Sequence, residues 1–309
     1  MMNTKNKTYV RLIFAISLLL ASLHISTQAQ TPSVSAPTET PTEGISLAPA
    51  RVELEMQPGS ETTVVVNLDY HSTAGSAQPV RIVASLNDWT ITEGGQVEFY
   101  RANTRPGSAS PWLIYSPAET TVTPGNIHSI RVTISVPADA TPGDHLTALI
   151  VEQRPDSIKL NQNRRQMVVR YRMASVFYIR VPKLTRRGSL ENLRAEARPN
   201  GIAVIPTLRN AGNSALRPLA SVAVMDSAGR VVAELPNGES LPVLGGSELS
   251  QPLLIEKMLA PGVYTVKFRI DFQDGSRMTE GVTDLVIRGA EARTTSAANS
   301  STPARPSNR

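Results

Sequence analysis

The segment from Trp112 to Val151 constrains the fold most strongly. It contains short apolar runs at Trp112–Tyr115, Ile130–Val136 and Leu146–Val151. Turn-forming residues separate these runs, with Thr-Pro-Gly before the second run and PADATPGDH before the third. Strands this short, at such regular spacing, predict an all-β sandwich. Because sandwiches of this kind work through edges, loops and faces, the pattern favours a binding protein.

The first 29 residues predict a signal peptide. Lys5, Lys7 and Arg11 precede a short apolar run at Leu12–Leu20, and Thr27-Gln28-Ala29 offers small residues for cleavage. The apolar run is too short for a comfortable membrane span, although an uncleaved anchor stays open as the alternative. We therefore expect a periplasmic protein without an integral membrane segment after cleavage, with the cell surface as the alternative location.

The composition after Ala29 limits the classes of function. The 28 Lys and Arg residues against 26 Asp and Glu are not the balance of a nucleic-acid-binding protein. The chain has no cysteine, and His71, His128 and His145 lie on separate segments, so we expect no thiol nucleophile and no metal site. Glu53 and Glu55 share a strand face and are expected at a solvated edge. We predict that the protein is not an enzyme and needs no cofactor.

Two β-rich blocks lie between low-complexity ends. Residues 30–43 and 289–309 are rich in Pro, Ser and Thr and are expected to be disordered. Between them we expect two immunoglobulin-like β-sandwiches, at 44–182 and 190–288. The boundary is expected near Pro182–Leu190, where Pro, Arg and Gly interrupt the strand pattern.

Several local features refine this expectation. Ile45–Met56 is expected to form an opening strand with imperfect alternation, and separate strands are expected at Val80–Leu86 and Thr90–Thr92. Asp274-Gly275 predicts a two-residue hairpin before the last strand. The two tryptophans are expected to pack in a core or between sheets, with a carbohydrate platform as the alternative; they are Trp89 and Trp112.

The run Gln166–Val181 is the longest uninterrupted strand pattern. At about 3.3 Å per residue it would extend for about 50 Å, which is more than one sandwich needs. Two interpretations stay open: a strand that covers the core and crosses into the next domain, or an edge strand that pairs with a partner chain. One face of this run is apolar, and the other face combines apolar residues with arginines. The residues in its first half that alternate in this way are Val169, Arg170, Tyr171, Arg172 and Met173.

Two such blocks behind a signal peptide resemble the periplasmic pilus chaperones, the PapD-like family. The likeness covers most of residues 44–182. It is carried by LAPARVELEMQPGSETTVVVNL at 47–68, by Thr123-Pro124-Gly125 before Ile130-Arg131-Val132, and by Val176-Phe177-Tyr178 before Arg180 and Pro182. The second block, with LRNAGNSALRP and LAPGVYTVKFRI, also resembles immunoglobulin-like modules of bacterial surfaces.

The resemblance implies a chaperone that caps surface-fibre or pilus subunits by β-strand addition. Arg51 falls at the position of the family's cleft arginine, while the family's lysine partner falls on Ser175, so Arg170 or Arg172 would have to replace it. The implied partners are secreted β-rich subunits with exposed edges and an outer-membrane assembly protein. The alternative function is a non-catalytic structural or adhesive envelope module that binds cell-wall or surface polymers.

These arguments predict a partner-binding site. The apolar face of the long strand would complete the open core of a subunit, and the arginines would bind its terminal carboxylate. The alternative for the first arginine is an ion pair with Glu53 or Glu55. The predicted residues are Arg51, Val169, Arg170, Tyr171, Arg172 and Met173.

Overall fold

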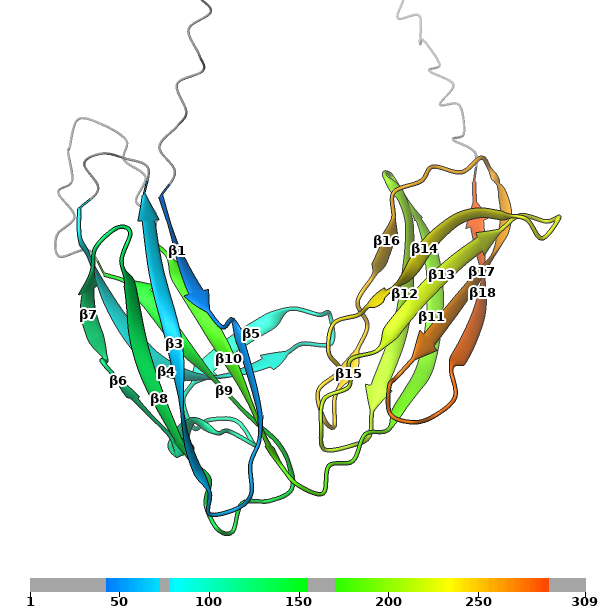
Figure 1. The fold of residues 1–309 in the computed structure, drawn as a ribbon. Helices are drawn as coiled ribbons and strands as arrows, with labels where there is room; N and C mark the ends of the chain where they lie inside the picture. Colours follow the sequence, from blue (N-terminus) through cyan, green and yellow to red (C-terminus); the bar gives the residue numbers. More distant parts are fainter. Residues whose placement is uncertain (1–42, 73–77, 155–169, 289–309) are drawn as a thin grey trace, which may run out of the picture. The chain divides into compact units, whose positions relative to one another are not determined.

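A computed structural model describes residues 43–72, 78–154 and 170–288. The predicted signal peptide, the linker up to residue 42, the tail 289–309 and Val169 lie outside the described residues. Within those ranges the regular structure is β-strand apart from one short helical turn, η1, at Ser110–Trp112 (Figure 1). None of the described helical structure is long and apolar enough to span a bilayer. The prediction of an all-β protein with two sandwiches is confirmed.

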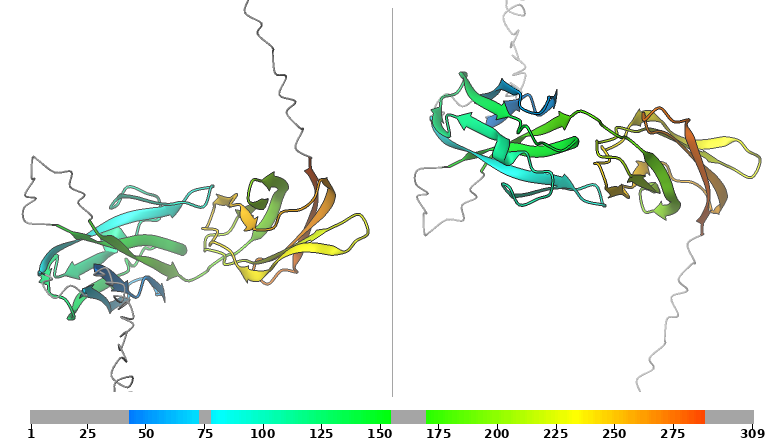
Figure 2. Two further views of the ribbon diagram at one scale, coloured as in Figure 1. Left: turned by 90° about the horizontal axis from the view of Figure 1, so that it is seen from above. Right: turned by 90° about the horizontal axis from the view of Figure 1, so that it is seen from below.

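The first sandwich contains two sheets (Figure 2). They enclose a core that includes Val66, Ile134, Leu149 and Phe177. One sheet has the strand order β1-β3-β8-β6, and the other has the order β2-β10-β9-β4-β5 with β7 beside β4. The strands are β1 (Glu43–Ala48), β2 (Arg51–Glu55), β3 (Glu61–Ser72), β4 (Val80–Ile91), β5 (Val97–Arg101), β6 (Leu113–Ser116), β7 (Glu119–Val122), β8 (Ile127–Ser135), β9 (Gly143–Gln153) and β10 (Arg172–Val181).

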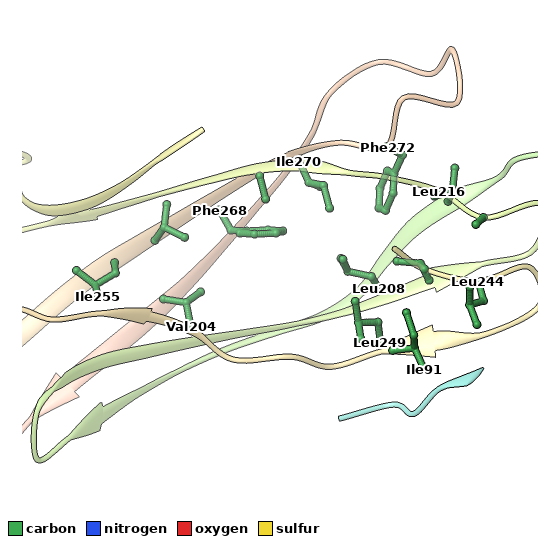
Figure 3. Close-up of a cluster of buried hydrophobic side chains, with 14 of the residues drawn as sticks. Ile91, Val204, Leu208, Leu216, Leu244, Leu249, Ile255, Phe268, Ile270 and Phe272 are labelled. Atoms are coloured by element: carbon green, nitrogen blue, oxygen red, sulfur yellow. The ribbon is translucent and has the colours of Figure 1, made fainter. Parts of the chain in front are cut away.

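The second sandwich also has two sheets. One has the order β11-β12-β15 with β16 beside β12, and the other has the order β14-β13-β17-β18. Figure 3 shows part of its core, in which Val204, Phe268 and Ile270 are fully buried. The strands are β11 (Gly188–Arg198), β12 (Gly201–Asn210), β13 (Leu219–Met225), β14 (Val231–Glu239), β15 (Glu248–Leu249), β16 (Leu253–Ile255), β17 (Gly262–Asp271) and β18 (Thr279–Ile287).

The opening segment is two strands rather than the one predicted over Ile45–Met56. β1 pairs with β3 in one sheet, and β2 pairs in parallel with β10 in the other. The reason lies in the alternation of buried residues: Ile45 and Leu47 are buried in β1, whereas Val52 and Met56 are buried in and after β2. Because this shift from odd to even positions would turn half of a single strand outward, the chain changes sheets between Ala48 and Arg51.

The long run is shorter as a strand than the sequence suggests. β10 begins at Arg172 and has 10 residues, which correspond to about 33 Å and suit one sandwich. Residues 166–169 of the predicted strand lie outside the described residues. The excess length inferred from the sequence is therefore not present in the described part of the strand.

The structure differs from the sequence prediction at two further places. Val80–Ile91 is one continuous strand, because Asp88, between the two predicted runs, is buried and accepts five hydrogen bonds from the segment that follows β5. Asp274-Gly275 lies within a longer connection between β17 and β18. There the Asp274 carboxylate accepts hydrogen bonds from the backbone N–H groups of Gly188 and Ser276, which favours a wider loop over a two-residue turn.

The tryptophans are packing residues, as predicted. Trp89 lies edge-on to Tyr178, with ring centroids 5.2 Å apart, and its indole N–H donates to the Thr147 carbonyl at 2.9 Å. Trp89 and Ile91 belong to the same hydrophobic cluster as the second-sandwich core, and Figure 3 shows Ile91 beside Leu249. Trp112 packs on His145, with centroids 4.2 Å apart.

Candidate partner-binding edge

One edge of β10 is covered along only part of its length. β9 pairs with the whole strand, from Arg172 to Val181. On the opposite side β2 pairs with it only from Val176 to Arg180. Among the described residues, no strand pairs with Arg172–Ser175 on that side. We call this uncovered stretch the β10 notch.

The notch exists because the chain changes sheets at this point. β1 lies in the opposite sheet, and β2 reaches β10 only after Pro49. The hydroxyl of Ser175 donates to the Pro49 carbonyl at 2.7 Å, and the N–H of Val176 donates to the Ala50 carbonyl at 2.9 Å. These two bonds close the notch at its downstream end.

The hydrogen bonds of β10 to β2 and to β9 show which way its backbone groups point. Val176 N–H and Arg180 C=O bond toward β2, whereas Tyr171 C=O accepts from Gln153 on the β9 side. Because backbone groups of successive strand residues point to opposite sides, Arg172 and Ala174 direct their N–H and C=O groups into the notch. The notch therefore offers unpaired groups of the kind that bind an added strand.

Four of the predicted site residues lie in the first two residues of β10 and the two residues before it, and they differ in burial. Tyr171 and Met173 are partly buried against the core of their own sandwich, so part of their apolar surface is used within this chain. Arg170 and Arg172 are exposed. Ser175, on which the sequence resemblance places a lysine, is fully buried and hydrogen-bonded, and it offers no charge at the surface.

Arg51 lies at the closed end of the notch, where it is the register partner of Val176. Its Nε is 3.1 Å from Glu53 Oε1, so the ion pair that the sequence left as an alternative is present. The side chain of Arg51 is nevertheless 51% exposed. A guanidinium with five donors and one such contact retains donors for a further carboxylate.

The sequence predicts that Glu53 lies at a solvated edge, but in the structure it is the centre of an ion-pair cluster. Arg180 Nη2 is 2.7 Å from Glu53 Oε2, and Arg217 Nη2 pairs with Glu53 Oε1. The Glu53 side chain is 24% exposed. Sequence reasoning missed Arg180 and Arg217 because only the parallel pairing of β2 with β10, and the approach of the segment before β13, bring them to Glu53.

The cluster is close to electrical balance. Arg180 Nε lies 3.8 Å from Asp144 Oδ1, and Arg217 Nη1 lies 3.6 Å from Glu239 Oε1. Burial raises the pKa of Glu53, but the nearby guanidinium groups of Arg217 and Arg180 outweigh burial and hold the pKa below its ordinary value. Glu53 is therefore ionised at neutral pH, and it anchors the two arginines that are less exposed than Arg51.

We expect Glu53→Gln to destabilise the protein by about 1–3 kcal/mol, because it leaves Arg180 and Arg217 without their shared carboxylate. Glu55→Gln is the matched control, since Glu55 is exposed and is in none of the ion pairs of the described residues. Thermal unfolding followed by circular dichroism measures the difference. Equal melting temperatures for the two variants would contradict the central role of Glu53.

The described residues contain no group of three or more His, Asp or Glu side chains placed to hold a metal ion. His145 Nε2 instead lies 2.9 Å from the Thr141 carbonyl oxygen, and His128 Nε2 accepts from the Thr123 N–H at 3.4 Å. His145 and His128 therefore make hydrogen bonds with backbone groups close to them in the chain.

No protein-family model and no curated protein matches the chain. Solved structures do match, at low identity. A structure from a chaperone–tip adhesin complex of CFA/I fimbriae biogenesis has 10% identity and a TM-score of 0.41, and covers 79% of this chain and 99% of that chain. The class 5 fimbriae chaperone CfaA has 12% identity, a TM-score of 0.38, and covers 79% and 100% respectively.

The Pseudomonas aeruginosa CupB2 chaperone has 16% identity and a TM-score of 0.35, and covers 77% of this chain and 97% of that chain. The likeness to these chaperones is one of fold.

Proposed function

We propose that this protein is a chaperone-like binding protein that pairs with an extended segment of a secreted β-rich subunit at the β10 notch. The observation that supports this is the partial cover of β10. Among the described residues, no strand pairs with the outward-facing backbone groups of Arg172 and Ala174, whereas the rest of β10 up to Arg180 is paired on both sides. In strand addition, backbone hydrogen bonds supply affinity and flanking side chains supply specificity. The predicted signal peptide would place this activity in the periplasm.

The position of Arg51 suggests how the partner would be oriented. The notch spans Arg172–Ser175, which corresponds to about 13 Å of extended chain. A partner strand in line with β2 and parallel to β10 would end beside Arg51. Its terminal carboxylate would then meet the exposed guanidinium, which binds carboxylates in a two-pronged geometry.

The flanking residues complete the proposed site. Arg170 and Arg172 are exposed beside the notch, and Tyr171 and Met173 lie between them and the sandwich core. These four residues and Arg51 form the proposed partner-binding site. Val169 also belongs to the proposal, but it lies outside the described residues. Binding of this kind requires neither a catalytic group nor a cofactor.

Co-purification from periplasm distinguishes this proposal from an envelope module. We expect the tagged protein to carry a poorly soluble β-rich subunit in a one-to-one ratio. Recovery of a cell-wall or surface polymer in place of a protein subunit would overturn the chaperone proposal and favour the module. An outer-membrane assembly protein in the same fraction would identify the next step of delivery.

We expect Arg51→Ala to weaken capture of such a subunit by about 1.5–3 kcal/mol, or roughly 10- to 150-fold, because a charge-assisted hydrogen bond is lost. Folding should change little, since Glu53 keeps Arg180 and Arg217 as partners. Subunit yield in the pull-down and a thermal melt measure the two effects.

Arg131→Ala is the matched control. Arg131 is exposed on β8, in the opposite sheet from the notch. Equal subunit yields from the Arg51→Ala and Arg131→Ala variants, with both folds intact, would show that no carboxylate anchor exists at Arg51.

A further inference from the structure

The two long sides of the second sandwich differ. On one side β11 and β18 pack closely, so that a Cβ added at Gly281 would lie 2.7 Å from Leu190 Cδ2. On the other side β14 and β16 approach each other without pairing (Figure 1). A cavity of about 630 Å³ lies there, lined by Val231–Leu235 and Leu254–Lys257. We call it the β14–β16 groove.

The walls of this groove are apolar and partly open to solvent. Val231 is 54% exposed and Leu254 is 53% exposed, whereas Ala233 and Ile255 are buried at its base. Val232 and Leu235 pack partly against the core. These half-exposed side chains leave apolar surface in contact with water. An apolar side chain of a ligand would cover this surface, and removing it from water would favour binding.

The backbone of β14 is also available. β14 is the last strand of its sheet, and no described strand pairs with its outer edge. Proline and charged residues commonly protect such edges, and here Pro236 and Glu239 occupy the second half of β14. The first half, Val231–Leu235, contains no proline, so its backbone can accept another strand.

The charges in the groove indicate what kind of segment would bind. Glu234 and Glu256 line the groove and are exposed, and no ion pair of the described residues includes either of them. Lys257 is the one cation among the lining residues. Lys267 and Arg269 line a neighbouring hollow with Glu234, but both are paired with Glu280. A bound segment with lysine or arginine beside its apolar residues would complement this surplus of negative charge.

We propose that the β14–β16 groove binds an extended polypeptide segment in which apolar residues alternate with lysine or arginine. The segment adds to the free edge of β14, its apolar side chains contact Val231, Leu254 and Ile255, and its cations lie near Glu234 and Glu256. This site belongs to the second sandwich and is separate from the β10 notch. It does not depend on the chaperone proposal.

Two labelled nine-residue peptides with blocked ends test the proposal: one alternates Val with Lys, and the other alternates Val with Glu. We expect the Val–Lys peptide to bind the signal-free full chain in fluorescence anisotropy at least tenfold more tightly than the Val–Glu peptide. The arginine-lined β10 notch would favour the Val–Glu peptide, so the two sites have opposite preferences. Any binding of the Val–Glu peptide is therefore assigned to the notch only if Arg51→Ala weakens it. No saturable binding of the Val–Lys peptide, or equal weakening of both peptides by Arg51→Ala, would overturn the proposal.

Two variants locate the site. Leu254→Arg places a charged side chain in the groove and should weaken binding of the Val–Lys peptide at least tenfold. Val263→Arg introduces the same residue at a similarly exposed valine, 61% exposed on β17 and outside the groove lining, and should leave binding unchanged. Amide hydrogen exchange should slow at Val231–Leu235 when the Val–Lys peptide is added. Equal losses in both variants, or protection only outside β14 and β16, would contradict the assignment.

Discussion

Asp88→Asn is expected to lower the free energy of unfolding by about 3–5 kcal/mol. Asp88 is buried on β4, and each of its carboxylate oxygens accepts hydrogen bonds. An asparagine in its place would replace one carboxylate oxygen with an NH2 group, so that a donor would face the donors that now bind this oxygen. The donors are the backbone N–H groups of Asn103, Thr104 and Arg105, at 3.2, 2.7 and 2.8 Å, and the hydroxyls of Ser108 and Ser110, at 2.6 and 2.7 Å.

The same carboxylate predicts a pH dependence. Burial raises the pKa of Asp88, but the hydrogen bonds from Ser108, Ser110 and the backbone outweigh burial, so the pKa lies below its ordinary value. A carboxyl group whose native pKa is depressed stabilises the fold above the unfolded pKa of about 3.9, and this stability is lost as the pH falls through the native pKa. The stability difference between wild type and Asp88→Asn should therefore be largest near neutral pH and shrink below about pH 4.

Urea unfolding at several pH values measures both effects. Asp139→Asn is the control, because it makes the same change at an exposed position in the connection between β8 and β9. It should alter stability by about 0.5 kcal/mol or less. A loss no larger for Asp88→Asn than for Asp139→Asn would mean that the segment after β5 holds its conformation without the Asp88 carboxylate.

Ala174→Pro is expected to reduce subunit capture by about 2–3 kcal/mol, or roughly 30- to 150-fold, because it removes an N–H group at the centre of the β10 notch and places a ring there. The N–H of Ala174 points away from β9, so the β9 pairing survives the substitution. Proline is tolerated in strands at such outward-facing edge positions. Quantitative pull-down of the co-purified subunit measures the effect.

Ala174→Ser is the matched control, since it keeps the N–H group and adds only a small hydroxyl. Capture should be close to that of wild type, and both variants should melt within a few degrees of it. If Ala174→Pro folds normally and still captures the subunit as well as Ala174→Ser does, partner binding does not use the backbone of β10. Binding would then have to be sought at another edge.

The strands themselves were largely predictable, because they depend on local patterns. Apolar runs bounded by Pro and Gly placed β6, β8 and β9 near their observed positions. The sheet change within Ile45–Met56 was also encoded locally, as the shift of buried positions from Leu47 to Val52. It was visible as imperfect alternation, but alternation alone does not say which sheet receives each half.

The candidate site was predictable only in part. The sequence placed β-strand residues and arginines around positions 170–173, and it offered Glu53 as a partner for Arg51. It gave no sign that Arg180 and Arg217 would share that glutamate, because the three residues are far apart in the chain. Their meeting depends on parallel pairing between β2 and β10, which has no local sequence signature.

The sequence by itself determined the all-β class, the two sandwiches and the alternation of β10, because residue type and period act through local backbone preference and burial. Only the tertiary structure decided which edges are covered. In the part of the chain that the structure describes, β2 pairs with Val176–Arg180 but no strand pairs with Arg172–Ser175 on that side, and β14 and β16 approach without pairing. Strand order and register depend on contacts between distant segments, so the open edges on which both proposals rest become visible only when the sheets are assembled.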